Sequence, residues 1–364
     1  MDITKTDETK STAEFSGNLF FFHAFDIGDD INLEAIENSQ LLIQQPVKLP
    51  KYFKDYHKPL EVEVPHPHEH SAFHSTKLHS FGAISITYKI PFYSTLEELK
   101  KELDDLDSKY LEYSVSDAAS IFKKIKKYIT QPKFFHIKSS YLVIQVYTQK
   151  DLDSSSLKQK YGQSIASLLR FETKNLSEYQ KNEILKSAMG YYKHDIIVVD
   201  SEAAFIADDD YIETLDLFEF ANVQQLEMQY FDLTLNKQLT AIYEKKIKPL
   251  TFKSYLPFIK TRSNADVEAL ERLKVDISVI TERLESSIMT ADDAYYSDIY
   301  NLLVYKLDLN SWRNSINQKL NIIKDVLTFY QSEIDSTRED LLNVLIIILI
   351  FIELVVGILH YISN

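Results

Sequence analysis

An apolar stretch near the end of the sequence, residues 341–359, constrains the chain more than any other feature. It runs for 19 residues without Lys, Arg, Asp or Pro, and Glu353 is its one charged residue. At a rise of about 1.5 Å per residue, such a helix is about 28 Å long, close to the hydrocarbon thickness of a bilayer. The alternative is a buried helix in a soluble oligomer. We expect residues 341–359 to form a single transmembrane anchor.

The N-terminal segment predicts on which side of the membrane the remaining chain lies. Residues 1–17 are polar and include acids. They lack the apolar core of a signal peptide and the Arg-rich character of a transit peptide. A terminal anchor without such a signal is inserted after the body of the chain has been translated. We therefore expect a tail-anchored, single-pass membrane protein with its N-terminal bulk in the cytoplasm.

Length and charge limit the remaining possibilities. A chain of 364 residues can hold two domains, each with its own core. The absence of Cys excludes disulfides and thiol chemistry. A net charge of −14 argues against direct nucleic-acid binding over a broad face.

The first 200 residues mix strand and helix patterns. After a disordered arm at 1–16, apolar or alternating runs predict strands near residues 18–26, 81–92, 141–147 and 194–200, with helices between them. The Pro- and His-rich segment 46–80 is expected to be an extended connection. The expected fold is an α+β head domain at 17–200, with no strand after Asp200.

Residues 201–340 predict a helical stalk. Helical periodicity covers about 213–244 and 294–306, and apolar residues repeat in heptads over 266–288 and again from 308 onward. The two heptad runs could pack as an antiparallel hairpin within one chain or as a coiled coil between chains. We favour the hairpin, with additional contacts between chains. The last helix continues into the anchor without a helix breaker.

Three residues interrupt the apolar anchor and could contact a second anchor. A carboxyl group near the bilayer core, as at Glu353, costs at least a few kcal/mol unless it finds a partner. Asn343 and Gly357 could join the same contact, because small and polar residues favour close packing of helices in lipid. The alternative places Glu353 near the far interface, where it is hydrated. We expect a homo-oligomer held by stalk and anchor.

The segment 46–80 contains six of the ten His residues and suggests a metal site. If the run is extended, His66, His68 and His70 point to one side, and imidazole is a common ligand of zinc, copper and nickel. The alternative is a polar loop without a physiological metal. A lysine-rich run at 122–128 could likewise contact phosphates, or form the solvated face of a helix.

Motifs for catalysis are missing from the sequence. There is no Gly-rich phosphate loop, HExxH, GxSxG or EF-hand loop, so no cofactor is expected. An enzyme would have to use polar residues at strand ends, such as His23, Asp26, His194 and Asp195.

The C-terminal half resembles the YagE-like family, whose eukaryotic members are called required for meiotic nuclear division. The similarity covers roughly residues 160–358, with Gln229 where an Arg is expected. It is carried by segments 161–172, 218–232, 309–320 and 345–354. The resemblance implies an α+β head, a helical hairpin and a hydrophobic end, without an established activity, and a link to mitochondrial inner membranes and translation.

Together these features predict a membrane-anchored, self-associating scaffold or tethering protein without catalytic activity. A protein or a ribosome is the expected partner, and a link to translation or membrane-protein biogenesis is one option. The alternatives are an enzyme or a ligand-binding head domain on a membrane anchor, and a metal-binding protein that uses the His-rich loop.

Overall fold

In the computed structural model, residues 13–45, 58–64, 67–134, 137–149, 152–244 and 294–363 are described, together with Arg272, Val275 and Ser278. The chain divides into two compact units. The first contains residues 1–230 and 281–312, and the second contains 231–280 and 313–364. The first unit therefore takes residues from both sides of the expected boundary at residue 200.

The first unit is built on a mixed sheet of eight strands, counted over the described residues. Along the sheet the order is β3-β4-β5-β6-β1-β8-β10-β9, with β10 parallel to β8 and the other pairs antiparallel. The strands are β1 (Glu14–Asp26), β3 (Gln44–Gln45), β4 (Leu60–Val62), β5 (Phe73–His79), β6 (Ala83–Thr95), β8 (Lys138–Val146), β9 (Ile196–Val199) and β10 (Ala203–Ala207). A separate pair joins β2 (Asp30–Ile31) to β7 (Ile129–Thr130).

The central strand β1 is buried on both faces, which explains its continuous apolar sequence. Side chains alternate between the two faces of a strand. Phe21 and Phe25 belong to the core on one face of the sheet. Phe20 and Phe22 belong to the core on the opposite face.

Helices α1 (Leu33–Ser39), α2 (Leu96–Ile125), α3 (Ser154–Leu168) and α4 (Glu178–Leu185) cover the first face. Thr95 caps α2 through a reciprocal pair of hydrogen bonds with Glu98. α2 is continuous for 30 residues because no Gly or Pro interrupts it, and the short 3₁₀ helix η1 (Lys126–Tyr128) follows.

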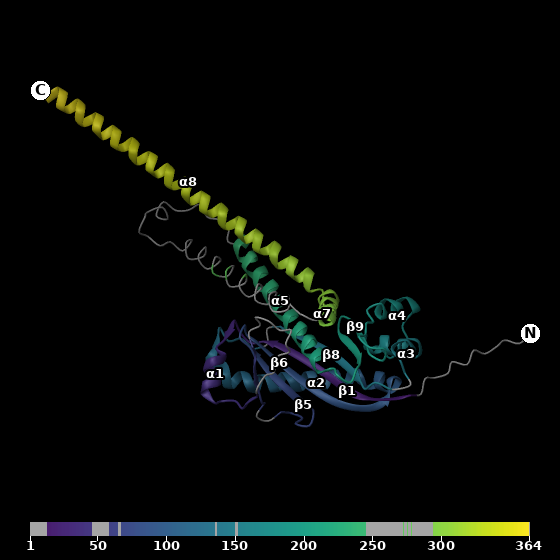
Figure 1. The fold of residues 1–364 in the computed structure, drawn as a ribbon. Coiled ribbons are helices and arrows are strands. Elements are labelled where there is room, and N and C mark those ends of the chain that lie inside the picture. The colour runs from purple at the N-terminus through teal and green to yellow at the C-terminus, as the bar shows by residue number, and fades with distance from the viewer. Residues whose placement is uncertain are drawn as a thin grey trace, which may run out of the picture. The chain divides into compact units, whose positions relative to one another are not determined.

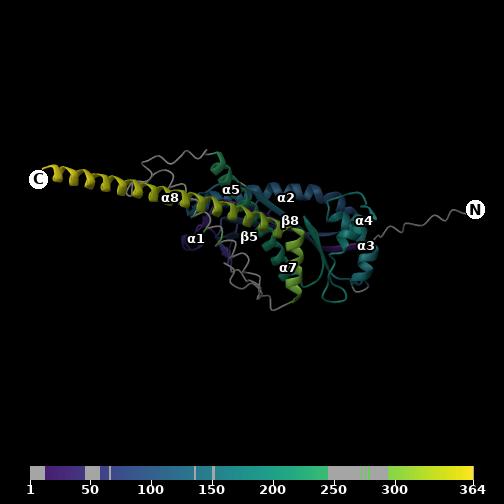
Figure 2. The same ribbon diagram turned by 90° about the horizontal axis from the view of Figure 1, so that it is seen from above.

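The opposite face is covered by the first half of α5 (Ile212–Glu244) and by α7 (Ala294–Lys306) (Figure 1). Leu215 and Phe218 of α5 and Leu303 of α7 pack against the apolar side chains of β1, β8 and β10. Figure 2 shows the same elements from above. The head is therefore a sheet between two helical layers, and the mixed α and β composition expected from the sequence is confirmed.

Among the strands that the sequence does not predict, β5 and β10 are the longest. β5 lies inside the segment expected to be an extended connection, where Ser75, Lys77 and His79 hide the apolar pattern. β10 follows Asp200, where no strand is expected, because its sequence AAFIA is short and mostly small. The expectation that strands end at Asp200 is wrong.

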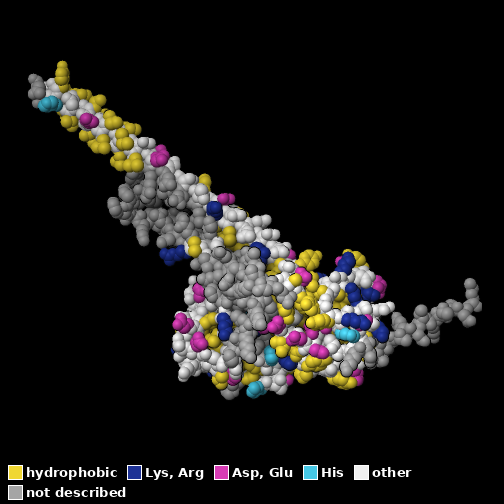
Figure 3. Space-filling model, in the orientation of Figure 1, with side chains coloured by type: hydrophobic (Ala, Val, Ile, Leu, Met, Phe, Trp, Pro, Cys, Tyr) yellow, Lys and Arg dark blue, Asp and Glu magenta, His cyan; other side chains and the backbone are white. Residues whose placement is uncertain are grey.

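The C-terminal helix α8 (Leu309–Ser363) is one continuous helix of 55 residues. Its segment Leu342–Ile362 has a mean hydropathy of 3.0, and no part of it is buried by the rest of the chain. Figure 3 shows the hydrophobic side chains along this end of α8. The expected C-terminal helix, long and apolar enough to cross a membrane, is confirmed.

Within the second unit, Asp232 of α5 binds α8. Its Oδ1 accepts a hydrogen bond from Ser315 Oγ at 2.7 Å and lies 2.5 Å from Lys319 Nζ. The heptad positions expected between residues 270 and 284 lie outside the described residues.

Candidate functional site

A cavity of about 170 Å³ lies between the sheet and the start of α5. We call it the α5 pocket. All of its walls belong to the first unit. It is lined by Phe20 and Phe22 of β1, His74, Ser75 and Lys77 of β5, Thr87 and Lys89 of β6, and Tyr211, Ile212, Leu215, Asp216 and Glu219 at the start of α5.

The strand register brings the floor of the α5 pocket together. Phe20 lies opposite Lys89, and Phe22 lies opposite Thr87. Thr87 in turn lies opposite Ser75 on β5. Because directly paired residues of antiparallel strands share one face, this row presents aromatic, hydroxyl and amine groups to α5.

A buried ion-pair cluster closes one end of the pocket. Lys77 Nζ lies 2.5 Å from Glu219 Oε2 and 3.2 Å from Asp216 Oδ1. Ser85 Oγ donates a hydrogen bond of 2.7 Å to Glu219 Oε1. Spacing of three residues along α5 places both carboxyl groups on the helix face that meets β5 and β6.

The charges of this cluster depend on one another. Burial favours a neutral Glu219, but the charge of Lys77 and the hydrogen bonds from Lys77 and Ser85 outweigh it and lower the pKa of Glu219. Burial also opposes the charge of Lys77, whose pKa is nevertheless raised by Glu219 and Asp216. Burial raises the pKa of Asp216, against the attraction of Lys77. Lys77 and Glu219 therefore form a charged pair at neutral pH.

Two groups in the α5 pocket are left without a partner of opposite charge or polarity. Lys89 Nζ lies 5.6 Å from the centre of the Phe20 ring, and Lys89 forms no ion pair with a described residue. The buried Thr87 Oγ1 has no hydrogen-bond partner in the described part of the chain. The pocket therefore offers a cation and a hydroxyl group to a ligand.

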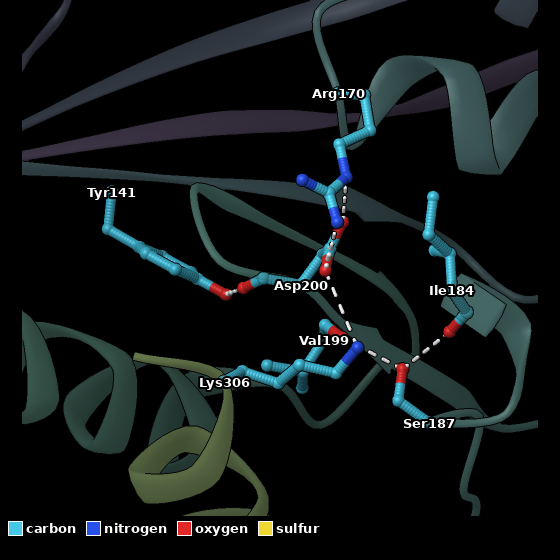
Figure 4. Close-up of polar contacts among 7 residues, drawn as sticks. All are labelled: Tyr141, Arg170, Ile184, Ser187, Val199, Asp200 and Lys306. Atoms are coloured by element: carbon cyan, nitrogen blue, oxygen red, sulfur yellow. Dashed lines mark hydrogen bonds and ion pairs between the residues drawn. The ribbon is translucent and has the colours of Figure 1, made fainter. Parts of the chain in front are cut away.

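A second polar cluster surrounds Asp200, at the turn between β9 and β10 (Figure 4). Asp200 Oδ2 lies 2.6 Å from Arg170 Nε, and Oδ1 lies 3.4 Å from Lys306 Nζ. The hydroxyl group of Tyr141 donates to the main-chain oxygen of Asp200 at 2.8 Å. Arg170 follows α3 and Lys306 ends α7, so this carboxylate joins the two helical layers at the edge of the sheet.

The structure separates the residues proposed for an enzymatic head. His23 lies within β1, with Nδ1 2.9 Å from Ser140 Oγ, and Asp26 ends that strand. His194 and Asp195 lie just before β9. Because β9 pairs with β10, β10 with β8 and β8 with β1, the start of β9 lies level with the beginning of β1. At a rise of about 3.4 Å per residue, β1 is roughly 40 Å long. His23 and Asp26 lie toward its end, whereas His194 and Asp195 lie level with its beginning.

The proposed metal ligands are only partly described. His66 lies outside the described residues. His68 Nδ1 lies 3.0 Å from Asp117 Oδ1 of α2, and His70 is exposed. No cluster of three or more His, Cys, Asp or Glu suited to a metal occurs among the described residues. The three-His site stays a prediction.

The residues proposed for contacts between anchors, Asn343, Glu353 and Gly357, are all exposed on α8. The lysine-rich run lies on the surface of the first unit, and its four lysines are exposed: Lys123, Lys124, Lys126 and Lys127.

Sequence reasoning missed the residues of the α5 pocket. Lys77 lies in a segment that looks like a loop, and Lys89 lies in a strand chosen for its apolar pattern. The available signal was the pair Asp216 and Glu219 among the apolar residues Leu215, Leu217 and Phe218, because acids at that spacing need a cation when the helix face is buried.

These features define a class: an α+β head domain in a chain that ends in a helix able to cross a membrane. Residues 16–213 match the family described as Uncharacterized protein MJ0711, N-terminal domain. The match covers more than half of the chain, so the chain belongs to this family. It is also 24% identical over 293 residues to Uncharacterized protein MJ0711 of Methanocaldococcus jannaschii, which covers 74% of this chain and 86% of that protein. No solved structure matches.

This family assignment corrects the expected YagE-like membership, which is wrong. The matching family is a different one, and its domain lies at residues 16–213 rather than in the C-terminal half. The misleading segments were helical and apolar stretches. Heptads and transmembrane runs recur in unrelated proteins because the same packing rules select the same residues.

Proposed function

We propose that the protein is a membrane-anchored, self-associating scaffold or tethering protein whose head domain lies on the cytoplasmic side. The observation that carries this proposal is the segment Leu342–Ile362, which has a mean hydropathy of 3.0 and is buried nowhere by the chain. Soluble proteins rarely expose contiguous apolar surface of this extent. A bilayer would cover all of it, because 21 helical residues extend about 32 Å.

Self-association is proposed from the polar residues of the anchor. At 100° per residue, Asn343, Gly357 and Glu353 lie within an arc of about 80° on one side of the helix. A carboxyl group on a lipid-facing surface costs at least about 2–3 kcal/mol, and a second anchor removes part of that cost by supplying polar partners. The helical stalk would add contacts between chains, with a protein or a ribosome as the tethered partner.

Extraction with alkaline carbonate tests the anchor. The informative variant is Ile348→Arg with Ile352→Arg, because both positions lie opposite the side that carries Asn343 and Gly357. Each Arg near the centre of a transmembrane helix costs about 2.5–3.5 kcal/mol of insertion free energy. We expect wild type to remain in the membrane pellet and the double-Arg variant to be released.

The matched control is Ile348→Leu with Ile352→Leu, which should behave as wild type. Release of wild type and double-Arg variant in equal amounts would contradict the anchor.

Self-association has its own readout, the mass of the purified protein in mild detergent. Glu353→Ala should lower that mass if anchors contact one another, and an unchanged monomer mass for wild type and variant would exclude it.

A second candidate function is a ligand-binding head domain. The observation that favours it is the α5 pocket, which combines aromatic walls with an amine and a hydroxyl group that are not used by the fold. The two functions are compatible, because the pocket and the anchor belong to different units of the chain.

A further inference from the structure

We propose that the α5 pocket binds a small organic monoanion with an apolar body, of the size and chemistry of benzoate. This inference is independent of the membrane anchor. It rests on the size of the pocket, on its apolar wall and on the distribution of charge around it.

The size of the α5 pocket selects a ligand of about one ring. Its volume of about 170 Å³ is close to that of apolar protein cavities of about 150 Å³ that hold one benzene molecule. A nucleotide or a peptide is too large to be enclosed here.

The apolar wall selects a hydrophobic body. Phe20, Phe22 and Leu215 line the pocket and belong to one hydrophobic cluster. The rings of Phe20 and Tyr211 lie 5.7 Å apart and are tilted by 52° to each other, so two aromatic side chains form part of this wall. Ile212, on the first turn of α5, is exposed at the entrance.

The charge distribution selects an anion. The carboxyl groups of Asp216 and Glu219 both contact Lys77, and Glu219 also accepts from Ser85, so each of these acids already has a partner within the fold. Lys89 is the lining cation that contacts no described carboxylate and lies over the aromatic floor. A cationic ligand would meet Lys89 without a free acid to bind it.

A ligand carboxylate would also satisfy the Thr87 hydroxyl group. This group is buried and has no partner in the described part of the chain, and a buried polar group without a hydrogen bond is costly. On the neighbouring strands, Thr87 lies opposite Phe22, and Lys89 lies opposite Phe20. Thr87 and Lys89 are two residues apart on β6, so both side chains project from the face of the sheet that forms the pocket. A small shift of the Thr87 side chain would let a carboxylate bound to Lys89 accept from its hydroxyl group as well.

Equilibrium dialysis of radiolabelled benzoate against the full chain in mild detergent tests the proposal, with detergent alone as the blank. We expect saturable binding of one benzoate per chain, with a dissociation constant below about 1 mM for so small a ligand. Lys89→Gln should weaken binding about tenfold or more, because a charge-assisted hydrogen bond is lost. Thr87→Val should weaken it about threefold to tenfold.

The matched control is Lys124→Gln, which removes an exposed lysine outside the pocket and should leave binding unchanged. Circular dichroism verifies that each variant is folded. Benzamide and benzylamine test the charge of the ligand, and both should bind more weakly than benzoate. Any of three results would overturn the proposal. They are no saturable benzoate binding up to 10 mM (about tenfold above the expected dissociation constant), benzoate binding by Lys89→Gln equal to that of wild type, and binding of benzylamine tighter than that of benzoate.

Discussion

Replacement of Lys77 by Met would remove the one cation that two carboxyl groups of α5 share. Glu219 is buried, and its Oε2 lies 2.5 Å from Lys77 Nζ. Met keeps much of the apolar stem of Lys77 and removes only its charge. The substitution therefore leaves the carboxylate of Glu219 with Ser85 as its remaining partner.

The expected loss of stability follows from burial. Removal of one partner from a buried ion pair destabilises a protein by about 3–5 kcal/mol, because the other charge stays behind in a poorly solvated place. The side chains of Lys77 and Asp216 are 15% and 26% exposed, so solvent screens part of the interaction. We expect the lower end of the range, about 3 kcal/mol. For a domain of 150–250 residues this corresponds to a fall in Tm of about 6–12 °C.

Thermal unfolding of the full chain in mild detergent, followed by circular dichroism at pH 7, measures this change. The deficit of Lys77→Met should be present at pH 7 and should shrink below pH 4.5, because Lys77 lowers the pKa of Glu219 below its ordinary value of 4.5 in the native wild type. A carboxyl group with a lowered native pKa stabilises the fold above its unfolded pKa, and loses this contribution as the pH falls through the native value.

The double variant Lys77→Met with Glu219→Gln should recover part of the lost stability, because the second substitution removes the stranded charge. Lys124→Met, at an exposed site, is the matched control and should leave Tm within about 2 °C of wild type. A change of less than 2 °C for Lys77→Met, or no recovery in the double variant, would refute a buried charged pair at this position.

Three further predictions concern the head domain. Burial and then the charge of Lys138 lower the pKa of His23 to about 3, so between pH 6.5 and 3 the unfolded chain binds a proton that the native chain does not. As the pH falls through this range, the free energy of unfolding of wild type should decrease by about 1.4 kcal/mol per pH unit more than that of His23→Gln, as measured by urea unfolding. Asp200→Asn should lower the free energy of unfolding by about 2 kcal/mol in the same assay, because Arg170 and Lys306 lose their shared carboxylate. An unchanged urea midpoint would show that Asp200 does not join the two helical layers. Gly82→Ala should lower Tm by more than 6 °C, because Gly82 has a φ of 97° and a Cβ there would lie 1.8 Å from the Gly28 main-chain oxygen. A Tm equal to that of wild type would mean that the backbone at residue 82 does not have this conformation.

Much of the head domain could be predicted because its central strands carry unambiguous patterns. β1 is apolar on both faces, and β8 contains the buried run from Tyr141 to Val146. β5 could not be predicted, because its polar residues Lys77 and His79 face a helix that lies more than 130 residues later in the sequence. A buried polar residue looks like a surface residue until its partner is known.

The candidate site was harder to predict than the fold for the same reason. Lys77 and Glu219 are 142 residues apart, and their contact depends on the packing of α5 against β5. The apolar end of α8 is the opposite case. Its signal is a local run of apolar residues, so residues 341–359 could be predicted almost as the structure has them, at Leu342–Ile362. Family membership could not be read from the helical segments, since their periodicity is shared by unrelated proteins.

The most direct test of the membrane anchor is flotation of the purified protein with phospholipid vesicles in a density gradient. The full chain and a chain that ends at Asp340 are compared after removal of detergent. We predict that the full chain floats with the vesicles and that the shortened chain stays at the bottom as a soluble protein. If the full chain is soluble without lipid or detergent, and the shortened chain aggregates, the helix is part of a protein core and the membrane anchor is contradicted.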